Sequence, residues 1–272
     1  MKKMDGWDKS KTWSWDIACW HHCPQQWRLH HQEASRYPLD VEAHRVFVHR
    51  SAPLFLPEDK PGDSVKAIDS EISGLLDFYP IQDVAKYAER YVKYCYGIRD
   101  LLEQPKPPAA LSDFIHGKIV TLDVKCGFET PYEVTHTVLV AMRGDNISIA
   151  NFMQPSFSIR GGEPVGSTPL HWADLSAALQ VASTASEDKV RVVLFAPDDP
   201  DSMIHGTKSR VKISAKSFTC DSARVKQGAT KFSWVSQLAL RAQAIGAYYT
   251  CRKRIYNCAG CMFRSSCWSV QE

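Results

Sequence analysis

The chain has 272 residues, of which 44% are hydrophobic and 23% are charged, as in an ordinary soluble globular protein. This length allows one large domain with its own core, or two small ones. The sequence has no run of eighteen apolar residues, and its first residues lack the apolar core of a signal peptide. We therefore expect a cytoplasmic protein that does not span a membrane. The net charge of +3 is small, so local basic clusters such as Arg252, Lys253 and Arg254 are more informative about partners.

Helical periodicity predicts three helices in the first part of the chain, over residues 14–31, 41–48 and 83–102. Pro24 interrupts the first of these, so it has to fall at a turn or at a helix start. The proline- and acid-rich segment 53–62 is typical of a loop. Three prolines within residues 104–109 end the third helix.

The rest of the chain mixes strand and helix patterns. Strands are predicted over residues 118–124, 146–152 and 190–196, and a strand or hairpin over 207–218. Helices are predicted from Thr168-Pro169 to residue 181 and over residues 232–249. Periodicity does not decide between helix and strand for residues 132–142. This mixture predicts an α/β or α+β fold with a central sheet.

Nine cysteines are many for a chain without the features of a small secreted domain, so we expect metal or redox chemistry rather than disulfides. Cys258, Cys261 and Cys267 have C-x2-C-x5-C spacing and can wrap one face of a metal or cluster. Cys23 is the best candidate for a fourth ligand, with Cys19 and Cys251 in reserve. A structural zinc site using Cys251 with the three tail cysteines is the alternative, because spacing alone does not separate zinc from an iron–sulfur cluster.

A second group of residues, Asp123-Val124-Lys125, ends an apolar predicted strand. Asp123 and Lys125 are two residues apart on a strand, so both side chains point to the same face. A carboxylate of this kind can hold Mg²⁺ or Mn²⁺. The lysine can orient or deprotonate a water molecule and offset developing negative charge. The pair therefore suits phosphodiester hydrolysis.

Such a metal site needs a second carboxylate. Asp113 lies ten residues before Asp123, and the segment 114–119 reads as a hairpin with its turn at His116-Gly117. A hairpin would bring the two aspartates together across neighbouring strands. Asp77, in Gly74-Leu75-Leu76-Asp77, is the second choice.

Together these residues resemble the RecB-like branch of the PD-(D/E)xK nucleases. Family members with an iron–sulfur cluster carry a cysteine in a C-P-x-x-aromatic motif near the N-terminus and three more cysteines at the C-terminus. Cys23-Pro24-Gln25-Gln26-Trp27 and the three tail cysteines match both halves, and the candidate nuclease residues fall between them. The segment from Asp123 to Gly127, and Gln154-Pro155, look most like phage-encoded members. The resemblance implies a [4Fe–4S] cluster held by Cys23, Cys258, Cys261 and Cys267.

The resemblance also implies roles in catalysis. Asp113 and Asp123 correspond to the two metal aspartates, with Val124 in the same metal site. Lys125 corresponds to the catalytic lysine.

Other family motifs match less closely. His44 corresponds to the upstream histidine that ligates metal, with His49 as the fallback. His136, in the catalytic set, and Val140 occupy the places of the Gln-x-x-x-Tyr motif that positions DNA. Ala110 stands where a glycine normally precedes the first aspartate.

The expected fold is α/β, with a restriction-endonuclease-like mixed sheet flanked by helices. A single nuclease domain would cover residues 1–272, in which 14–31 and 245–272 together form a cluster-bearing subdomain.

We expect a DNA nuclease that uses Mg²⁺ or Mn²⁺ and acts on single-stranded ends as an exonuclease. A recombination or DNA-processing protein is a candidate partner. Two alternatives stay open: a nuclease-fold protein that only binds DNA or protein, and a zinc-stapled assembly protein.

Overall fold

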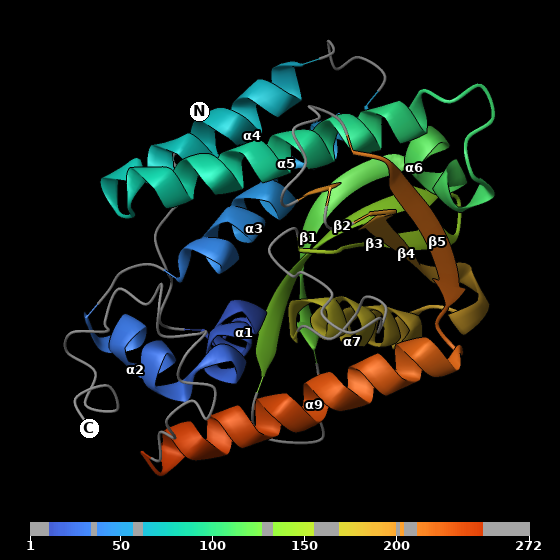
Figure 1. Cartoon of the computed structure of the whole chain (residues 1–272). Coiled ribbons are helices and arrows are strands. Elements are labelled where there is room, and N and C mark those ends of the chain that lie inside the picture. The colour runs from blue at the N-terminus through green and yellow to red at the C-terminus, as the bar shows by residue number, and fades with distance from the viewer. Residues whose placement is uncertain are drawn as a thin grey trace.

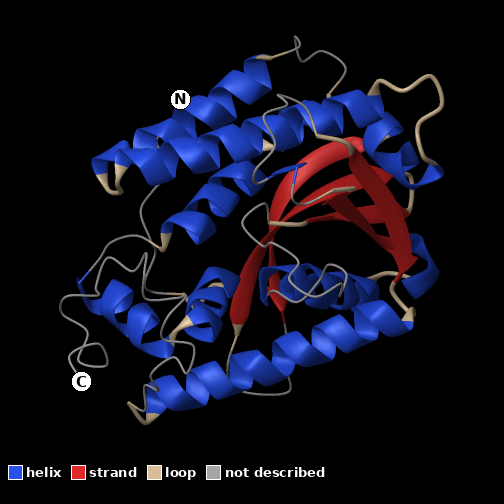
Figure 2. Ribbon diagram, in the orientation of Figure 1, coloured by secondary structure: helices blue, strands red, loops and turns tan. Residues whose placement is uncertain are grey.

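The computed structural model describes residues 11–33, 37–56, 62–126, 133–154, 169–199, 202–203 and 211–246. These ranges form an α/β structure in which helices cover both faces of a central sheet (Figure 1, Figure 2). The α/β expectation with a mixed sheet flanked by helices is therefore confirmed. Within these ranges, no helix combines the length and the apolar character needed to cross a membrane.

The sheet has five strands in the order β1-β2-β3-β4-β5. They are β1 (Lys118–Cys126), β2 (Val134–Arg143), β3 (Asn146–Phe152), β4 (Val190–Pro197) and β5 (Ile213–Thr219). Neighbouring strands are antiparallel except β3 and β4, which run parallel. A parallel pair needs a crossover connection, and helix α7 (Pro169–Thr184) lies between these two strands in the sequence.

Three helices lie on one side of the sheet (Figure 1). They are α3 (Leu39–Arg50), α4 (Asp63–Ser73) and α5 (Ile81–Leu102). Phe47 of α3 packs edge-on against Phe152 of β3, with ring centroids 5.0 Å apart, and Phe152 stacks on Phe195 of β4 at 5.1 Å. The Tyr94 hydroxyl of α5 donates to the backbone carbonyl of Phe195 at 2.7 Å. Aromatic burial therefore fixes α3 and α5 on the sheet.

Helix α7 covers the opposite face, and α9 (Ala223–Ala244) packs on the outer side of α7 (Figure 1). Leu175 and Ala178 of α7 share an apolar cluster with Val225 and Phe232 of α9 and with strand residues such as Ile149. Because α7 is enclosed between the sheet and α9, most of its residues are buried.

The first two helices, α1 (Ser14–His22) and α2 (Pro24–Glu33), lie near the Cys126 end of β1. The backbone N–H of Thr135 donates to the carbonyl of Thr12 at 2.9 Å, and Trp13 forms a β-bridge with Thr135. Pro24 is the first residue of α2, one of the two positions that the sequence allowed it.

Short helices connect the main elements. They are α6 (Ser112–His116), η1 (Ala52–Phe55), η2 (Gly74–Asp77), η3 (Ala109–Leu111) and η4 (Glu187–Lys189). The predicted hairpin over 114–119 is wrong, because the N–H of Gly117 donates to the carbonyl of Asp113 at 2.8 Å and closes a helical turn. That turn buries Phe114 against Phe55 and Phe195. Asp113 therefore lies on a helix and not on a strand.

Candidate functional site

The exposed end of β1 carries the two residues on which the nuclease prediction depends. Asp123 and Lys125 both lie on the solvent side of this edge strand, and their side chains leave the same face because they are two residues apart. Ile119, on the same face, joins the core beneath α3 and α5. The helices thus cover one end of this face, while Asp123 and Lys125 stay exposed at the other.

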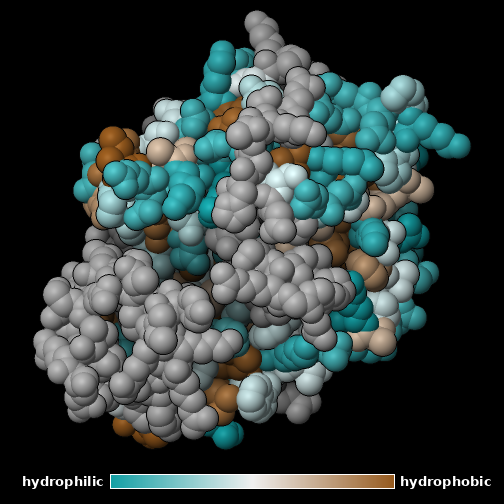
Figure 3. Space-filling view, viewed as in Figure 1, coloured by the Kyte–Doolittle hydropathy of each residue, from teal (hydrophilic) through white to brown (hydrophobic). Residues whose placement is uncertain are grey.

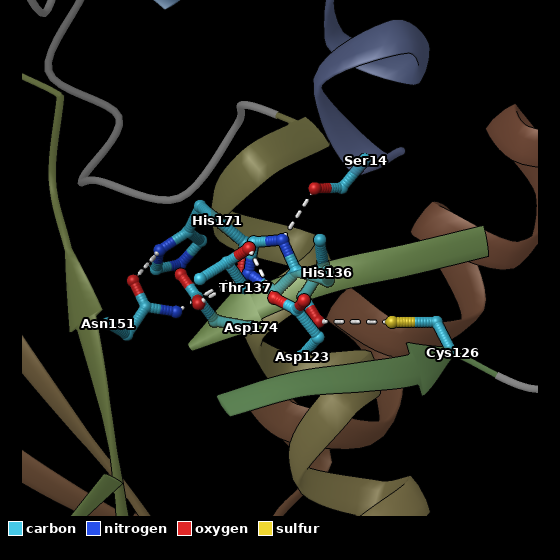
Figure 4. A network of polar contacts seen from close by, with 9 residues as sticks. Ser14, Asp123, Cys126, His136, Thr137, Asn151, His171 and Asp174 are labelled. Atoms are coloured by element: carbon cyan, nitrogen blue, oxygen red, sulfur yellow. Dashed lines mark hydrogen bonds and ion pairs between the residues drawn. The ribbon is translucent and has the colours of Figure 1, made fainter. Parts of the chain in front are cut away.

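Asp123 is held by its neighbour on β2. The hydroxyl of Thr137, directly opposite in the strand pairing, donates to Oδ1 of Asp123 at 2.8 Å (Figure 4). The Asp123 carboxylate also acts electrostatically on His49, near the end of α3. Burial lowers the pKa of His49 to about 4, the positive charge of Arg45 adds to this, and the negative charge of Asp123 opposes it. His49 is therefore an α3 histidine within electrostatic reach of Asp123.

His44 lies deeper in the protein. Its Nδ1 shares a hydrogen bond of 2.9 Å with the hydroxyl of Tyr91, and the side chain is enclosed by Trp15 and Phe47. Burial lowers the pKa of His44 to about 3, with the charge of His136 adding to this. These contacts make His44 a neutral core residue. The fallback His49 is therefore better placed than His44 to join Asp123 in a metal site.

Lys125 forms an ion pair with Glu133, which immediately precedes β2. The ammonium lies 2.8 Å from the Glu133 carboxylate, and both side chains are more than half exposed. Exposed pairs of this kind contribute little to stability and exchange partners easily. The ammonium is therefore accessible to a phosphate group.

The structure does not bring Asp113 and Asp123 together. Oδ2 of Asp113 accepts a hydrogen bond of 2.7 Å from the hydroxyl of Ser148 on β3. In the sheet, Ser148 pairs with Ala141, which pairs with Ile119 of β1. Ile119 is four residues from Asp123, roughly 13 Å at about 3.3 Å per residue. Metal–oxygen bonds of about 2.0–2.6 Å do not allow one ion to bridge that separation. Asp77, the second choice, lies at the end of η2 between α4 and α5.

His136 faces the other side of the sheet, where it joins a buried polar network (Figure 4). Its Nε2 lies 2.7 Å from Oδ1 of Asp174 on α7, and its Nδ1 lies 2.5 Å from the hydroxyl of Ser14 on α1. Burial raises the pKa of Asp174, and the His136 interaction opposes that rise. Serine, histidine and aspartate in contact can form a nucleophilic triad, but Ser14 has no exposed surface. The network therefore joins α1, β2 and α7 rather than contacting a substrate.

A second buried pair lies beside this network. His171 of α7 shares a hydrogen bond with the Asn151 side-chain oxygen, and the Asn151 amide donates to the backbone carbonyl of His171 at 3.1 Å (Figure 4). Burial lowers the pKa of His171 to about 3, with the charge of Arg224 adding to this. His171 is therefore neutral at physiological pH and fixes the start of α7 on β3.

Val124 contributes its backbone, not its side chain, to the region of Asp123. The side chain packs into the apolar cluster beneath α7, and Val124 pairs with His136 in the sheet. Any metal contact from Val124 has to come from its main chain.

Cys23 lies between α1 and α2 and is partly exposed, whereas Cys19 is buried in the core, where burial raises the pKa of its thiol. Of the two N-terminal cysteines, Cys23 is therefore the more accessible. The predicted ligands Cys258, Cys261 and Cys267, and the reserve Cys251, lie outside the described residues.

The residues on β1 fit a weakly coordinated divalent cation. Within the described ranges, no group of three or more His, Cys, Asp or Glu side chains is placed to hold a metal ion. Mg²⁺ usually keeps several waters and is bound through one or two carboxylates together with substrate phosphates. The exposed Asp123 carboxylate, fixed through Oδ1 by Thr137, suits that mode of binding.

Several residues of these sites were not identified from the sequence. Thr137 and Glu133 could have been identified as neighbours of Asp123 and Lys125 by pairing β1 with β2 as antiparallel strands. Ser14 is 122 positions from His136, and Asp174 is 38 positions away, so no local pattern signals their contact.

No family model, curated protein or solved structure matches this chain.

Proposed function

We propose that this protein is a divalent-metal-dependent deoxyribonuclease with its site on the exposed end of β1. The observation that carries the proposal is the side-by-side placement of Asp123 and Lys125 on one exposed face of an edge strand. The mixed sheet with helices on both faces, and the resemblance of the motifs to RecB-like nucleases, support the same reaction. Single-stranded DNA ends are the substrate that the resemblance implies.

Each residue of this site has a distinct chemical task. Asp123 would hold Mg²⁺ or Mn²⁺, whose charge would stabilise the attacked phosphate. Lys125 orients or deprotonates the attacking water and offsets negative charge as it develops. Thr137 fixes the Asp123 carboxylate through a hydrogen bond to Oδ1. Glu133 holds Lys125 until a DNA phosphate replaces it.

A [4Fe–4S] cluster, with zinc as the alternative, forms a second part of the proposal. Cys23 would bind it together with Cys258, Cys261 and Cys267. Cys23 follows α1, which is anchored to β2 through Ser14 and His136. The cluster would therefore tie the C-terminal cysteines to the part of the molecule that also carries the site.

A DNA-binding protein without cleavage is the second candidate. The separation of Asp113 from Asp123 favours it, because the described residues then offer a single aspartate beside Lys125. A zinc-stapled assembly protein is the remaining alternative.

A cleavage assay separates these functions. Anaerobically purified protein is mixed with end-labelled single- and double-stranded DNA, with Mg²⁺, with Mn²⁺ or with no divalent metal. The nuclease proposal predicts metal-dependent cleavage that Lys125→Ala removes without changing the unfolding temperature. DNA binding with no cleavage under any metal would support the second candidate. A zinc-loaded protein that ignores DNA would support the third.

A further inference from the structure

The outer face of α9 has an unusual set of exposed side chains. Trp234 is 64% exposed, Leu238 is 38% exposed, and Ile245, just beyond the helix, is 76% exposed. Positions 234, 238 and 245 fall on one side of a helix with 3.6 residues per turn. Figure 3 shows hydrophobic side chains among hydrophilic ones along the lower edge of the molecule, where α9 lies.

The charges of this helix all have one sign. Its 22 residues include four basic side chains, Arg224, Lys226, Lys231 and Arg241, and no acidic side chain. Lys231 and Arg241 are exposed and lie on the same side as Trp234, within about 60° of it at 100° per residue. They are ten residues apart, about 15 Å along the helix axis. An exposed indole thus lies between two cations.

The two cations differ in how they are held. The Lys231 ammonium lies over the ring of Trp172 on α7, 5.6 Å from the ring centroid, which orients the side chain. Arg241 lies in the last turn of α9, where a basic side chain interacts favourably with the helix C-terminus. Both can still meet a phosphate, because a cation–π contact and a helix-end interaction leave N–H groups available.

We propose that this face of α9 binds single-stranded DNA, with a base stacked on Trp234 and phosphates held by Lys231 and Arg241. Exposed aromatics next to basic side chains are the general means of binding unpaired bases without sequence preference. A duplex would offer its phosphates but no free base face for the indole. The choice of DNA rests on the proposed nuclease function, since the same chemistry also binds RNA.

Charge also argues against a second copy of the chain as the occupant. In a symmetric antiparallel pair centred between Trp234 and Leu238, Lys231 of one copy would face Arg241 of the other. Like charges opposed in an interface are unfavourable. A polyanion is complementary to the same pattern.

The α9 face and the β1 site lie on opposite sides of the sheet, but β1 is an edge strand. In this proposal, a DNA strand held on α9 would reach Asp123 and Lys125 by passing round this edge. The α9 face would then act as an anchor that holds the strand during cleavage.

Fluorescence anisotropy of labelled oligothymidylate with the full chain, in buffer without divalent metal, tests the proposal. Trp234→Ala is expected to weaken binding about tenfold, and Trp234→Phe is expected to restore most of the affinity. The double variant Lys231→Gln/Arg241→Gln is expected to weaken binding and to reduce the slope of log affinity against log salt by about 1.4. Lys86→Gln, an exposed site on α5, is the matched control and is expected to bind like the wild type.

Unchanged affinity in both the Trp234→Ala and the double variant would overturn the proposal. A wild-type dimer in sedimentation that Trp234→Ala dissociates, with DNA affinity unchanged, would also overturn it and would identify a self-interface. Failure of the nuclease proposal gives a different result: binding still depends on Trp234, but no metal supports cleavage. Binding to oligouridylate that equals or exceeds binding to oligothymidylate would overturn the choice of DNA.

Discussion

At the scale of single residues, side-chain direction on β1 and β2 separates the candidate catalytic groups. Asp123 and Lys125 leave one face of the sheet, and His136 leaves the other. Strand periodicity predicts the first of these facts, because residues two apart share a face. Periodicity does not say which residues face each other across two strands, and the pairing register places His136 opposite Val124. His136 thus belongs to the buried network that joins α1, β2 and α7, on the face opposite Asp123.

The Ser14–His136–Asp174 network gives a residue-scale prediction about stability. Ser14→Ala leaves His136 without one buried hydrogen-bond partner, which typically costs about 1–3 kcal/mol of unfolding free energy. We expect a lower thermal midpoint with metal-dependent cleavage retained, because the fully buried Ser14 is not accessible to a substrate. Thermal unfolding and cleavage measured on the same preparation check this. Loss of cleavage with an unchanged midpoint would instead indicate a nucleophilic role for Ser14.

A pH dependence follows from two buried histidines. Burial lowers the pKa of both His44 and His171 to about 3, so the folded state keeps them neutral while the unfolded chain binds protons below pH 6.5. Their contribution is therefore complete above about pH 6.5 and is lost as the pH falls toward 3. At pH 5 the loss is about 2 kcal/mol for each histidine.

Denaturant unfolding between pH 7 and pH 4.5 measures this effect. His44→Phe removes one titrating group, so its stability is expected to fall less steeply with decreasing pH, by about one proton. A variant whose stability follows the wild-type pH dependence would contradict the assignment. Because the phenyl ring also loses the Tyr91 hydrogen bond, the comparison uses the slope and not the absolute stability.

At the scale of elements, helices and strands with a clear hydrophobic periodicity could be predicted from the sequence. Elements whose bounds depend on packing against other parts of the chain could not. The amphipathic helix expected over 83–102 is α5, and the strand expected over 146–152 is β3 with the same bounds. Helix α4 was not predicted at all. Helix α9 begins nine residues before the predicted start, because Ser222 caps it and Gly228 does not interrupt it. Tertiary packing explains Gly228, since it lies against Leu175 of α7.

Gly97 and Gly228 both lie where a helix packs closely against another part of the chain, but the neighbouring atoms differ. A Cβ at Gly97 of α5 would lie 2.3 Å from the backbone carbonyl oxygen of Val211, whereas a Cβ at Gly228 of α9 would lie 2.1 Å from the side-chain Cδ1 of Leu175. The Leu175 side chain can rotate, whereas the Val211 carbonyl can move only if the backbone that leads into β5 shifts. Alanine gains up to about 1 kcal/mol over glycine in helix propensity, but overpacking costs about 1–3 kcal/mol.

We therefore expect both Gly97→Ala and Gly228→Ala to destabilise the protein, with Gly97→Ala the more harmful. Chemical denaturation measures both free energies of unfolding. Gln227→Ala, at an exposed neighbouring position of α9, is the control and is expected to be close to neutral. Equal effects of the two glycine variants would mean that Leu175 is as rigid as the backbone at Val211.

At the scale of the whole molecule, the sequence predicts the α/β class and the mixed sheet but not how the candidate residues meet. Motif order placed Asp113 beside Asp123 through a hairpin, and the structure replaces that hairpin with α6 followed by β1. Local sequence does not show this, because the turn of α6 packs Phe114 against Phe55 and Phe195, which are distant in the sequence. The fold class can be predicted from hydrophobic patterning along the chain. The placement of the site residues depends on contacts between segments that are distant in the sequence.

The proposed cluster gives a prediction at this scale, because it would close a loop that spans most of the chain. Metal binding to such a loop contributes directly to folding. We expect anaerobically purified protein to contain iron and acid-labile sulfide, and Cys23→Ala or Cys258→Ala to lose both and to lower the thermal midpoint. Cys220→Ala, at a buried position beside α7, is the control and is expected to retain the iron. Stoichiometric zinc without iron would identify the alternative zinc site.

The comparison of Asp123→Asn with Asp113→Asn in the Mn²⁺-dependent cleavage assay tests the central claim most directly. The two carboxylates lie on different elements, and only Asp123 shares an exposed face with Lys125. We predict that Asp123→Asn lowers the cleavage rate by about a hundredfold or more, while Asp113→Asn stays near the wild-type rate, with both variants folded. Equal loss in both variants would contradict a site centred on Asp123 and Lys125, and would require the two aspartates to act together.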